Sequence, residues 1–290
     1  MPKVLISDKL SPKAAEIFRE RGLDVDFRPG IKDDELISAI KDADGLAIRS
    51  ATTVTAELMD AAESLKVVGR AGIGVDNVDV NAATERGVVV MNTPFGNSVT
   101  TAEHAIAMMM SLARQLPAAN ASTHAGKWEK SAFMGMELAS KTLGLIGCGN
   151  IGSIVVDRAQ GLKMRVVVYD PFLSPEKAME IGVEKVDFDY LLRRADVVTI
   201  HAPLTDGTRN LLDATAFAKM KDGVRIINCA RGGLLKENAI KTGLESSKIA
   251  GVALDVFAEE PAKKNILFGE ERVVATPHLG ASTTEAQEKV

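Results

Sequence analysis

Short runs of β-branched hydrophobic residues alternate along the chain with longer amphipathic segments. In the longer segments apolar residues recur every three or four positions, which is the period of a helix with one buried face. Strands that alternate with helices predict βαβ units and a largely parallel sheet. In the first part of the chain, strands are expected at residues 4–7, 45–49, 65–69 and 88–91, and helices at 12–21, 33–41, 56–63 and 80–86.

The pattern changes after Met91. Turn-forming residues dominate 92–98, and a long helix with few charges is expected over 101–116. Residues 94–100 are therefore predicted to be a hinge between two domains. The three methionines at 108–110 are interpreted as core residues rather than as part of a cofactor site. A second series of strands is expected at 142–146, 165–169, 197–201, 224–228, 251–255 and 272–275.

Composition narrows the class of protein. A chain of 290 residues predicts two domains, and a net charge of −4 gives no reason to expect nucleic-acid or membrane binding. The only cysteines, Cys148 and Cys229, form no Cys-x-x-Cys pair, so neither a disulfide scaffold nor a metal site is predicted. The N-terminus has no signal-peptide core, and no apolar stretch approaches the length of a membrane span. A cytoplasmic location is expected.

The strongest local motif is GCGNIG at residues 147–152, which lies between an apolar strand and a helix. Gly147 permits a tight turn, Gly149 lets the backbone approach a pyrophosphate, and Gly152 lets the helix pack closely on the sheet. Asp170 ends the next expected strand, where a carboxylate binds ribose hydroxyls and repels a 2′-phosphate. A turn without a ligand is the alternative, but the flanking strand and helix favour a dinucleotide site. Asp170 favours NAD over NADP at that site.

Several ordered motifs resemble those of the D-isomer-specific 2-hydroxyacid dehydrogenases and together span nearly the whole chain. The resemblance implies an α/β fold with two doubly wound parallel-sheet domains. A flavodoxin-like substrate domain would comprise residues 1–98 and 283–290, and an inserted Rossmann NAD-binding domain residues 99–282. The motifs are GRAGIGVDNVD at 69–79, MNTP at 91–94, NCARGG at 228–233, ALDVF at 253–257, EEP at 259–261 and PHLGAST at 277–283.

The resemblance also implies a catalytic trio. Oxidation of a 2-hydroxy acid needs a base for the hydroxyl proton and a cation for the carboxylate. His278 is implied as the acid/base, Glu260 as the carboxylate that pairs with it, and Arg231 as the cation. Glu259 is the alternative to Glu260, but the residue directly before Pro261 fits the family pattern better.

The remaining histidines are given lesser roles. His104 and His124 are interpreted as structural or surface residues, and His201, at a strand end, as part of the wall of the NAD pocket. Cys229 is interpreted as a wall residue and not a nucleophile, because no paired base can be identified beside it. The two glycines after Arg231 are expected to let substrate or nicotinamide approach the backbone. Family positions that line NAD are matched by Asn150, Ile151, Ala202, Cys229, Ala230, Gly280 and Asp255, the last of these at the nicotinamide carboxamide.

Substrate choice is predicted from the first domain. The backbone of Gly72, Ile73 and Gly74 matches the family loop that meets the substrate carboxylate. Arg49 and Arg70, at strand ends, suit a doubly anionic substrate, and NAD-dependent oxidation of 3-phosphoglycerate is our hypothesis. Ordinary ion pairs are the alternative reading of these two arginines.

Three other functions are left open by the sequence. One is a glyoxylate or hydroxypyruvate reductase of the same family, the second is a non-catalytic NAD-sensing corepressor-like protein, and the third, less well matched, is an NAD-dependent hydrolase. A homodimer or homotetramer is implied, with the dimer built through residues 101–128. The chain stops at Val290, inside a helix expected from Ser282, so we also expect a truncated polypeptide without the C-terminal regulatory domains of many family members.

Overall fold

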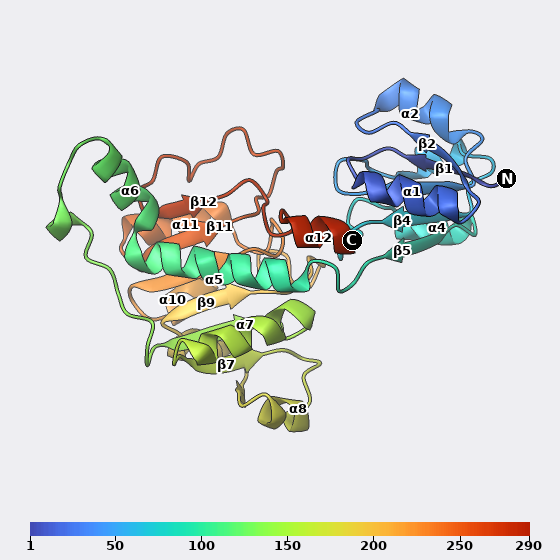
Figure 1. Cartoon of the computed structure of the whole chain (residues 1–290). Coiled ribbons are helices and arrows are strands. Elements are labelled where there is room, and N and C mark those ends of the chain that lie inside the picture. Colours follow the sequence, from blue (N-terminus) through green and yellow to red (C-terminus); the bar gives the residue numbers. More distant parts are fainter. The chain divides into compact units, whose positions relative to one another are not determined.

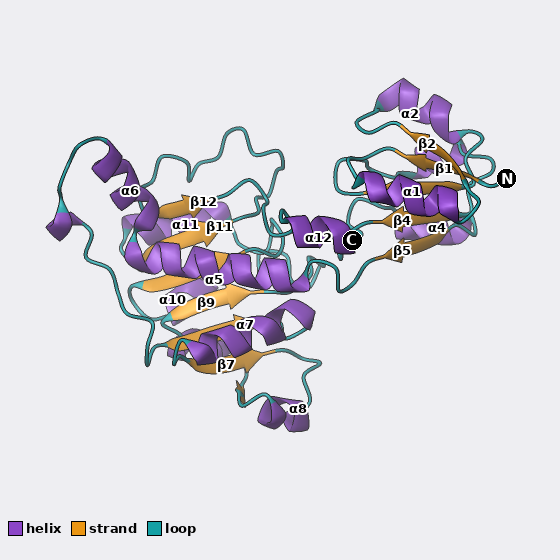
Figure 2. Cartoon of the chain, viewed as in Figure 1, coloured by secondary structure: helices purple, strands orange, loops and turns teal.

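Two compact units make up the chain, and the computed structural model describes residues 1–290. Unit 1 comprises residues 1–97 and 281–290, and unit 2 comprises residues 98–280. These boundaries lie within two residues of the predicted ones. Each unit is a parallel sheet with helices packed on it (Figure 1 and Figure 2), so the predicted α/β class with two parallel-sheet domains is confirmed.

Unit 1 contains a five-stranded sheet with the order β2-β1-β3-β4-β5, which is the flavodoxin-like order. Its strands are β1 (Lys3–Ile6), β2 (Asp24–Phe27), β3 (Gly45–Ile48), β4 (Val67–Arg70) and β5 (Val89–Asn92). Its helices are α1 (Pro12–Glu20), α2 (Asp33–Ile40), α3 (Ala56–Asp60), α4 (Val80–Glu85) and α12 (Thr284–Lys289). The sequence analysis missed β2, because this short edge strand carries Asp24 and Asp26 and lacks a continuous hydrophobic run.

Unit 2 contains a seven-stranded sheet with the order β12-β11-β10-β9-β6-β7-β8, the Rossmann order with one added strand. Its strands are β6 (Thr142–Ile146), β7 (Arg165–Tyr169), β8 (Glu184–Lys185), β9 (Val197–Ile200), β10 (Val224–Asn228), β11 (Ile249–Leu254) and β12 (Val273–Ala275). Its helices are α5 (Ser98–Arg114), α6 (Leu116–His124), η1 (Lys130–Ala132), α7 (Asn150–Gly161), α8 (Pro175–Glu180), α9 (Phe188–Arg194), α10 (Ala214–Lys219) and α11 (Glu237–Glu245).

Helices cover both faces of the unit 2 sheet. One hydrophobic cluster joins the sheet to α5 and α7, and a second joins it to α9, α10 and α11 (Figure 1). Strands buried on both faces read as continuous hydrophobic runs, which is why the central strands were predictable. No helix is both long enough and apolar enough to span a membrane.

The predicted hinge and long helix need correction. Helix α5 already begins at Ser98, inside the segment expected to be the hinge, and it ends at Arg114. Gln115 has a φ of +53°, and this left-handed residue ends the helix expected over 101–116 two residues early and separates α5 from α6. Met108 and Met109 are core residues, as predicted, whereas Met110 is partly exposed.

The carboxyl ends of the unit 2 strands reach the same edge of the sheet. Ile200 of β9 lies opposite Ile146 on one side and opposite Asn228 on the other, and Asn228 lies opposite Leu254 of β11. The strand order reverses between β6 and β9, and open α/β sheets bind ligands at such a point. The residues that follow the strand ends along this edge are Gly147, His201, Cys229, Asp255 and Thr276.

Candidate active site

The glycine-rich turn lies between β6 and α7, and its three glycines have different surroundings. Gly147 has a φ of +90°, and a Cβ there would lie 2.6 Å from the His201 carbonyl oxygen. A Cβ on Gly152 would lie 2.2 Å from the Gly147 carbonyl oxygen. A Cβ on Gly149 would meet no atom within 4 Å. Gly147 and Gly152 are thus required by the protein's own packing, whereas Gly149 borders open space.

This turn and its helix fit a dinucleotide. Helix α7 has no side-chain cap at its N-terminus, and helix N-termini of this kind bind phosphates, here next to the open side of Gly149. Asn150 and Ile151, two residues of the predicted cofactor set, form the first turn of this helix.

Asp170 lies beside the glycine-rich turn, although 22 positions separate it from Cys148 in the chain. Its carboxylate accepts the N–H of Cys148 over 2.7 Å and the N–H of Phe172 over 2.7 Å. Burial and the nearby Asp170 charge raise the pKa of the Cys148 thiol to about 11. Cys148 is therefore a neutral thiol at pH 7. The acidic residue beside the turn is Asp170, which directly follows β7, where the sequence placed it.

His201 lies at the switch point, at the end of β9. Its Nε2 atom is 3.0 Å from the Thr199 hydroxyl, and its buried Nδ1 atom has no hydrogen-bond partner in the protein. Burial lowers the pKa of His201 to about 4, so the ring is neutral at pH 7. Of the other predicted wall residues, Ala202 follows His201 directly and is half-buried, and Cys229 follows β10 and is buried. Burial, aided by the Asp255 charge, strongly raises the pKa of the Cys229 thiol, which excludes a thiolate there at pH 7.

His278 and Glu260 form a direct pair. The Nδ1 atom of His278 lies 2.7 Å from Oε2 of Glu260, and Oε1 of Glu260 accepts the N–H of Phe257 over 3.0 Å. Partial burial opposes ionisation of Glu260, but the hydrogen bonds from His278 and Phe257 outweigh it and lower the pKa of this carboxyl. Glu260 is thus an oriented carboxylate beside an imidazole.

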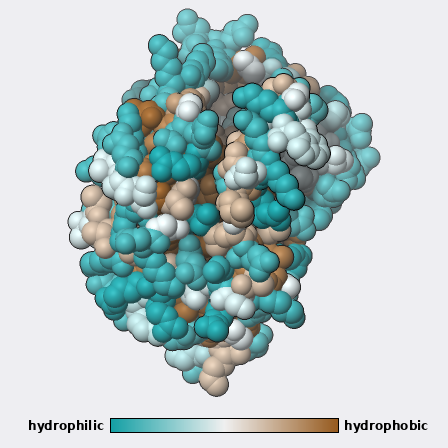
Figure 3. Space-filling view, turned by 90° about the vertical axis from the view of Figure 1, so that its left-hand side faces the viewer, coloured by the Kyte–Doolittle hydropathy of each residue, from teal (hydrophilic) through white to brown (hydrophobic).

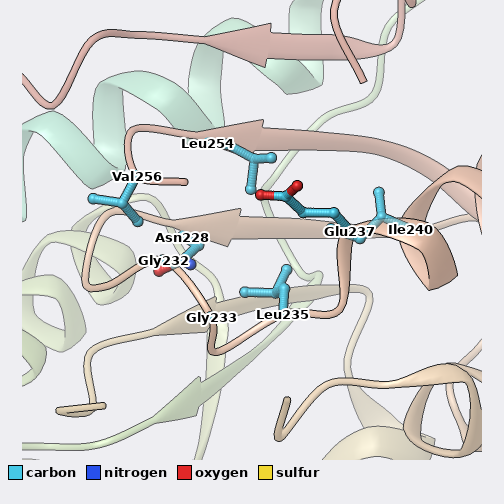
Figure 4. A pocket seen from close by; sticks show the side chains of 8 residues that line it. All are labelled: Asn228, Gly232, Gly233, Leu235, Glu237, Ile240, Leu254 and Val256. Atoms are coloured by element: carbon cyan, nitrogen blue, oxygen red, sulfur yellow. The ribbon is translucent and has the colours of Figure 1, made fainter. Parts of the chain in front are cut away.

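The sequence analysis missed Glu237, which anchors the loop that carries Glu260. It begins α11, and its carboxylate accepts the N–H of Ala258 over 3.1 Å and the side-chain amide of Asn265 over 2.9 Å. Figure 4 shows this side chain reaching across from α11 towards Leu254 of β11. Nothing in the sequence near Glu237 indicates this role, because its partners are more than 20 positions away.

Arg231 lies in the turn that follows β10. The buried side chain of Asn228 shapes this turn, since its amide donates to the Arg231 carbonyl over 2.8 Å and its oxygen accepts the Ala230 N–H over 3.0 Å. One expectation for this turn was wrong. A Cβ on Gly232 would lie 1.7 Å from the Phe257 carbonyl oxygen, so this glycine makes room for the chain's own backbone rather than for a ligand.

Asp255, predicted to meet the nicotinamide, has 0% of its surface exposed. Its carboxylate accepts the N–H groups of Leu279 and Gly280, over 2.7 and 2.8 Å, and the Thr276 hydroxyl over 2.6 Å. Its Oδ1 atom also lies 3.2 Å from Nε2 of His104. The assignment of Asp255 and Gly280 to the cofactor site therefore rests on the family resemblance alone. His104, which was interpreted as a structural or surface residue, contacts the Asp255 carboxylate.

In unit 1 the predicted substrate residues gather at the carboxyl edge of the sheet. Arg70 ends β4 opposite Ile48, the last residue of β3, and Arg49 follows Ile48. The Arg70 guanidinium lies against Gly72, where a Cβ would be 1.7 Å from Nη1, and the Gly72 N–H donates to the Thr93 hydroxyl over 2.7 Å. Gly72, with Ile73 and Gly74 after it, thus forms a loop beneath an arginine.

Arg49 is held from two sides. Its guanidinium donates to Oε1 of Gln287 over 2.5 Å, and burial lowers its pKa. The sequence analysis missed Asp8, a buried residue after β1 whose carboxylate accepts the N–H groups of Arg49, Ala51 and Thr52. A lone acidic residue directly after a buried strand is the one signal that could have indicated it.

Comparison with known proteins gives a consistent result. Residues 106–280 match the model of the D-isomer specific 2-hydroxyacid dehydrogenase, NAD binding domain. The chain is 48% identical over 286 residues to the D-3-phosphoglycerate dehydrogenase of Archaeoglobus fulgidus and 49% identical over 287 residues to that of Homo sapiens. These alignments cover 98% and 99% of this chain but 54% of each relative, so the chain spans about half the length of the curated relatives it matches.

Solved structures agree with the fold. A glyoxylate reductase from Paecilomyes thermophila is 31% identical, with a TM-score of 0.91, and the alignment covers 99% of this chain and 91% of that one. A D-lactate dehydrogenase from Aquifex aeolicus, complexed with NAD and lactic acid, is 25% identical, with a TM-score of 0.87, and the alignment covers 99% and 91% of the two chains.

Proposed function

Because the chain belongs to the D-isomer-specific 2-hydroxyacid dehydrogenase family, we propose that it oxidises D-3-phosphoglycerate to 3-phosphohydroxypyruvate with NAD, the first step of serine biosynthesis. The observation that carries the proposal is the 2.7 Å contact between His278 and Glu260, at the sheet edge that also holds the glycine-rich turn. The names of the relatives that are 48–50% identical support the choice of substrate.

The acid–base step is assigned to His278. Its Nδ1 atom faces the Glu260 carboxylate, so Nε2 is the atom that takes the proton of the substrate hydroxyl. Glu260 holds the ring in this tautomer and stabilises the imidazolium that forms, as a carboxylate does in other imidazole–carboxylate pairs. Arg231 binds the substrate carboxylate, since a guanidinium matches a carboxylate with two parallel hydrogen bonds.

The cofactor is assigned to the turn between β6 and α7. The chemistry that NAD would supply there is an acceptor for the hydride from C2 of the substrate. The open side of Gly149 and the N-terminus of α7 would hold its phosphates, and Asp170 would bind the ribose hydroxyls and disfavour NADP. Further contacts are assigned to residues at the carboxyl edge of the sheet: Asn150, Ile151, Ala202, Cys229, Ala230, Asp255 and Gly280.

The phosphorylated substrate is assigned to unit 1. Arg49 follows the end of β3 and Arg70 is the last residue of the neighbouring β4, and two cations there suit a substrate with a carboxylate and a phosphate. The backbone of Gly72, Ile73 and Gly74 would meet the substrate carboxylate.

The test is steady-state NADH formation over a panel of D-3-phosphoglycerate, D-glycerate, D-lactate and glycolate, repeated with NADP. We expect D-3-phosphoglycerate to have the highest kcat/KM, and NAD to be preferred.

Arg49→Ala and Arg70→Ala should each raise the KM for phosphoglycerate by about tenfold or more, the size of one lost charged hydrogen bond. Arg28→Ala, at an exposed arginine paired with Asp26, is the control. An unchanged KM in both variants would rule out these arginines as the phosphate site, and a preference for unphosphorylated acids would favour a glyoxylate or hydroxypyruvate reductase.

Assembly into a homodimer through residues 101–128 is also part of the proposal. Large exposed hydrophobic side chains lie on this region and just after it: Met110, Leu116, Trp128 and Met134. Figure 3 shows the side of the molecule on which α6 lies in Figure 1, with hydrophobic residues among hydrophilic ones. Large exposed apolar patches are rare on monomeric proteins and often mark surfaces that contact another protein. Sedimentation equilibrium should give twice the chain mass of 30.9 kDa, and a monomer at micromolar concentration would contradict it.

A further inference from the structure

A pair between the half-buried imidazole of His104 and the buried carboxylate of Asp255 contacts the turn that carries His278. Nε2 of His104, on α5, is 3.2 Å from Oδ1 of the fully buried Asp255. The Thr276 hydroxyl donates to the same oxygen over 2.6 Å and lies 3.2 Å from His104 Nε2. A buried carboxylate is costly unless donors replace the lost water, and these two side chains add to the backbone donors of Asp255, the N–H groups of Leu279 and Gly280.

The balance of forces on Asp255 agrees with this arrangement. Burial opposes its ionisation, but hydrogen bonds from His104, Thr276 and the Leu279 N–H outweigh burial and hold the pKa of Asp255 below its usual range. The carboxylate can therefore accept hydrogen bonds from the backbone at full strength at neutral pH.

The backbone groups that donate to the Asp255 carboxylate belong to the turn that carries His278. The Leu279 N–H donates to Oδ1 over 2.7 Å and the Gly280 N–H to Oδ2 over 2.8 Å. The His278 N–H donates to the Asp255 carbonyl oxygen over 2.9 Å. His278 has a φ of +55°, a left-handed conformation that costs about 1–3 kcal/mol outside glycine and persists only where the surroundings impose it.

Helix α5 contacts this turn a second time. The Thr101 hydroxyl, one helical turn before His104, donates to the Gly280 carbonyl oxygen over 2.9 Å. One face of α5 therefore binds the turn directly through Thr101 and indirectly through His104 and Asp255.

We propose that His104 is a positioning residue for His278: its imidazole orients the Asp255 carboxylate, which in turn holds residues 278–280 in the conformation that presents the His278 ring. The kinetic consequence rests on the proposed function, whereas the structural consequence does not. The competing explanation is that His104 only fills space between α5 and the sheet.

The first test measures amide hydrogen exchange in the absence of any ligand. His104→Leu removes the donor and keeps the bulk, and His104→Gln keeps a donor near the position of Nε2. We expect exchange at Leu279 and Gly280 to be about tenfold faster in the leucine variant, because opening of the turn becomes easier, and to return close to the wild-type rate in the glutamine variant. The N–H of Cys148, bound to Asp170 over 2.7 Å, is the internal reference and should not change.

A second pair of variants covers the case in which His104→Leu does not fold. Thr276→Val removes the other side-chain donor to Asp255 and should give the same faster exchange at Leu279 and Gly280. Thr242→Val removes an exposed hydroxyl that donates to the Asn238 carbonyl over 3.2 Å within a helix, and it is the matched control that should leave exchange unchanged.

The kinetic test separates positioning from binding. With D-3-phosphoglycerate, His104→Leu should lower kcat by about tenfold and change KM by less than about twofold, and His104→Gln should recover most of kcat. Unchanged exchange at Leu279 and Gly280 in folded His104→Leu and Thr276→Val would overturn the proposal, as would equal losses of kcat in the leucine and glutamine variants. If exchange responds as expected but the wild type oxidises no 2-hydroxy acid, the proposed function fails and the positioning of the turn by His104 stands.

Discussion

At the scale of single residues, His278 is held in place by contacts to both its ring and its backbone N–H. Nδ1 faces Glu260 over 2.7 Å, and the backbone N–H donates to the Asp255 carbonyl oxygen. Glu260 is fixed in turn by the Phe257 N–H. Each group is thus held by at least two others, which is how a site keeps a proton-transfer geometry.

Substitution of the pair should reduce the chemical step unequally. His278→Gln should lower kcat by about 10²–10⁴-fold, the usual contribution of a general acid/base. Glu260→Gln should lower kcat by about 10–100-fold, equivalent to one charged hydrogen bond of roughly 1.5–3 kcal/mol. Glu259→Gln, at the exposed neighbouring residue, is the control and should leave kcat unchanged. A larger loss in Glu259→Gln than in Glu260→Gln would contradict the assignment.

His201 should make the stability of unit 2 depend on pH. The unfolded chain binds a proton at this residue near pH 6.5, whereas the folded chain binds it only near pH 4 because of burial. The unfolded state therefore binds more protons between these values, so the contribution is fully present above pH 6.5 and is lost as the pH falls towards 4. This contribution of His201 to the free energy of unfolding amounts to at most about 3 kcal/mol.

Denaturant unfolding at pH 7.5 and pH 4.5 checks this prediction. The free energy of unfolding should fall more over this interval in the wild type than in His201→Gln, which cannot titrate. Equal falls in the two proteins would mean that His201 does not titrate abnormally in the folded chain.

At the scale of elements, the turn between β6 and α7 joins a strand to a helix at close quarters. Gly152 permits the helix to approach the strand end, since a methyl group there would lie 2.2 Å from the Gly147 carbonyl oxygen. Gly149 has no such neighbour in the protein. The two glycines are therefore separable: Gly152 serves the contact between strand and helix, and Gly149 borders the space assigned to the proposed cofactor.

This separation predicts opposite results for two alanine variants. Gly152→Ala should lower the free energy of unfolding by about 1–3 kcal/mol, the cost of forced overpacking. Gly149→Ala should cost less than about 1 kcal/mol but weaken NAD binding more than tenfold, because the methyl group occupies the space assigned to the phosphates. Thermal unfolding and calorimetric titration with NAD measure the two effects, and tight NAD binding by Gly149→Ala would place the phosphates elsewhere.

At the scale of the whole molecule, each unit has its own hydrophobic core, and the proposed cofactor residues all belong to unit 2. A ligand stabilises the unit that binds it, by about 2.7 kcal/mol at a concentration of 100 Kd. We therefore expect scanning calorimetry to resolve two transitions and saturating NAD to raise only one of them. Hydrogen exchange should assign the raised transition to β6–β11. A single transition that NAD raises as a whole would show that the units unfold as one.

The sequence by itself determined the alternation of strands and helices, the division into two units and the glycine-rich turn. These features depend on local physics: the period of buried positions, the φ values open to glycine, and the steric need for a residue without a side chain. The edge strand β2 escaped because its four residues include two aspartates. The His278–Glu260 pair was anticipated through the resemblance, since no local pattern joins residues 18 positions apart.

Only the tertiary structure decided which groups contact the residues of the proposed site. His104 meets Thr276 although 172 positions separate them, and Glu237 holds a loop more than 20 positions away. Asp8 binds the N–H of Arg49 across 41 positions. Such partners come together because parallel strands deliver their carboxyl ends to one edge and a helix packs across them. A buried carboxylate takes whichever donors that packing supplies, and the order of residues along the chain does not reveal them.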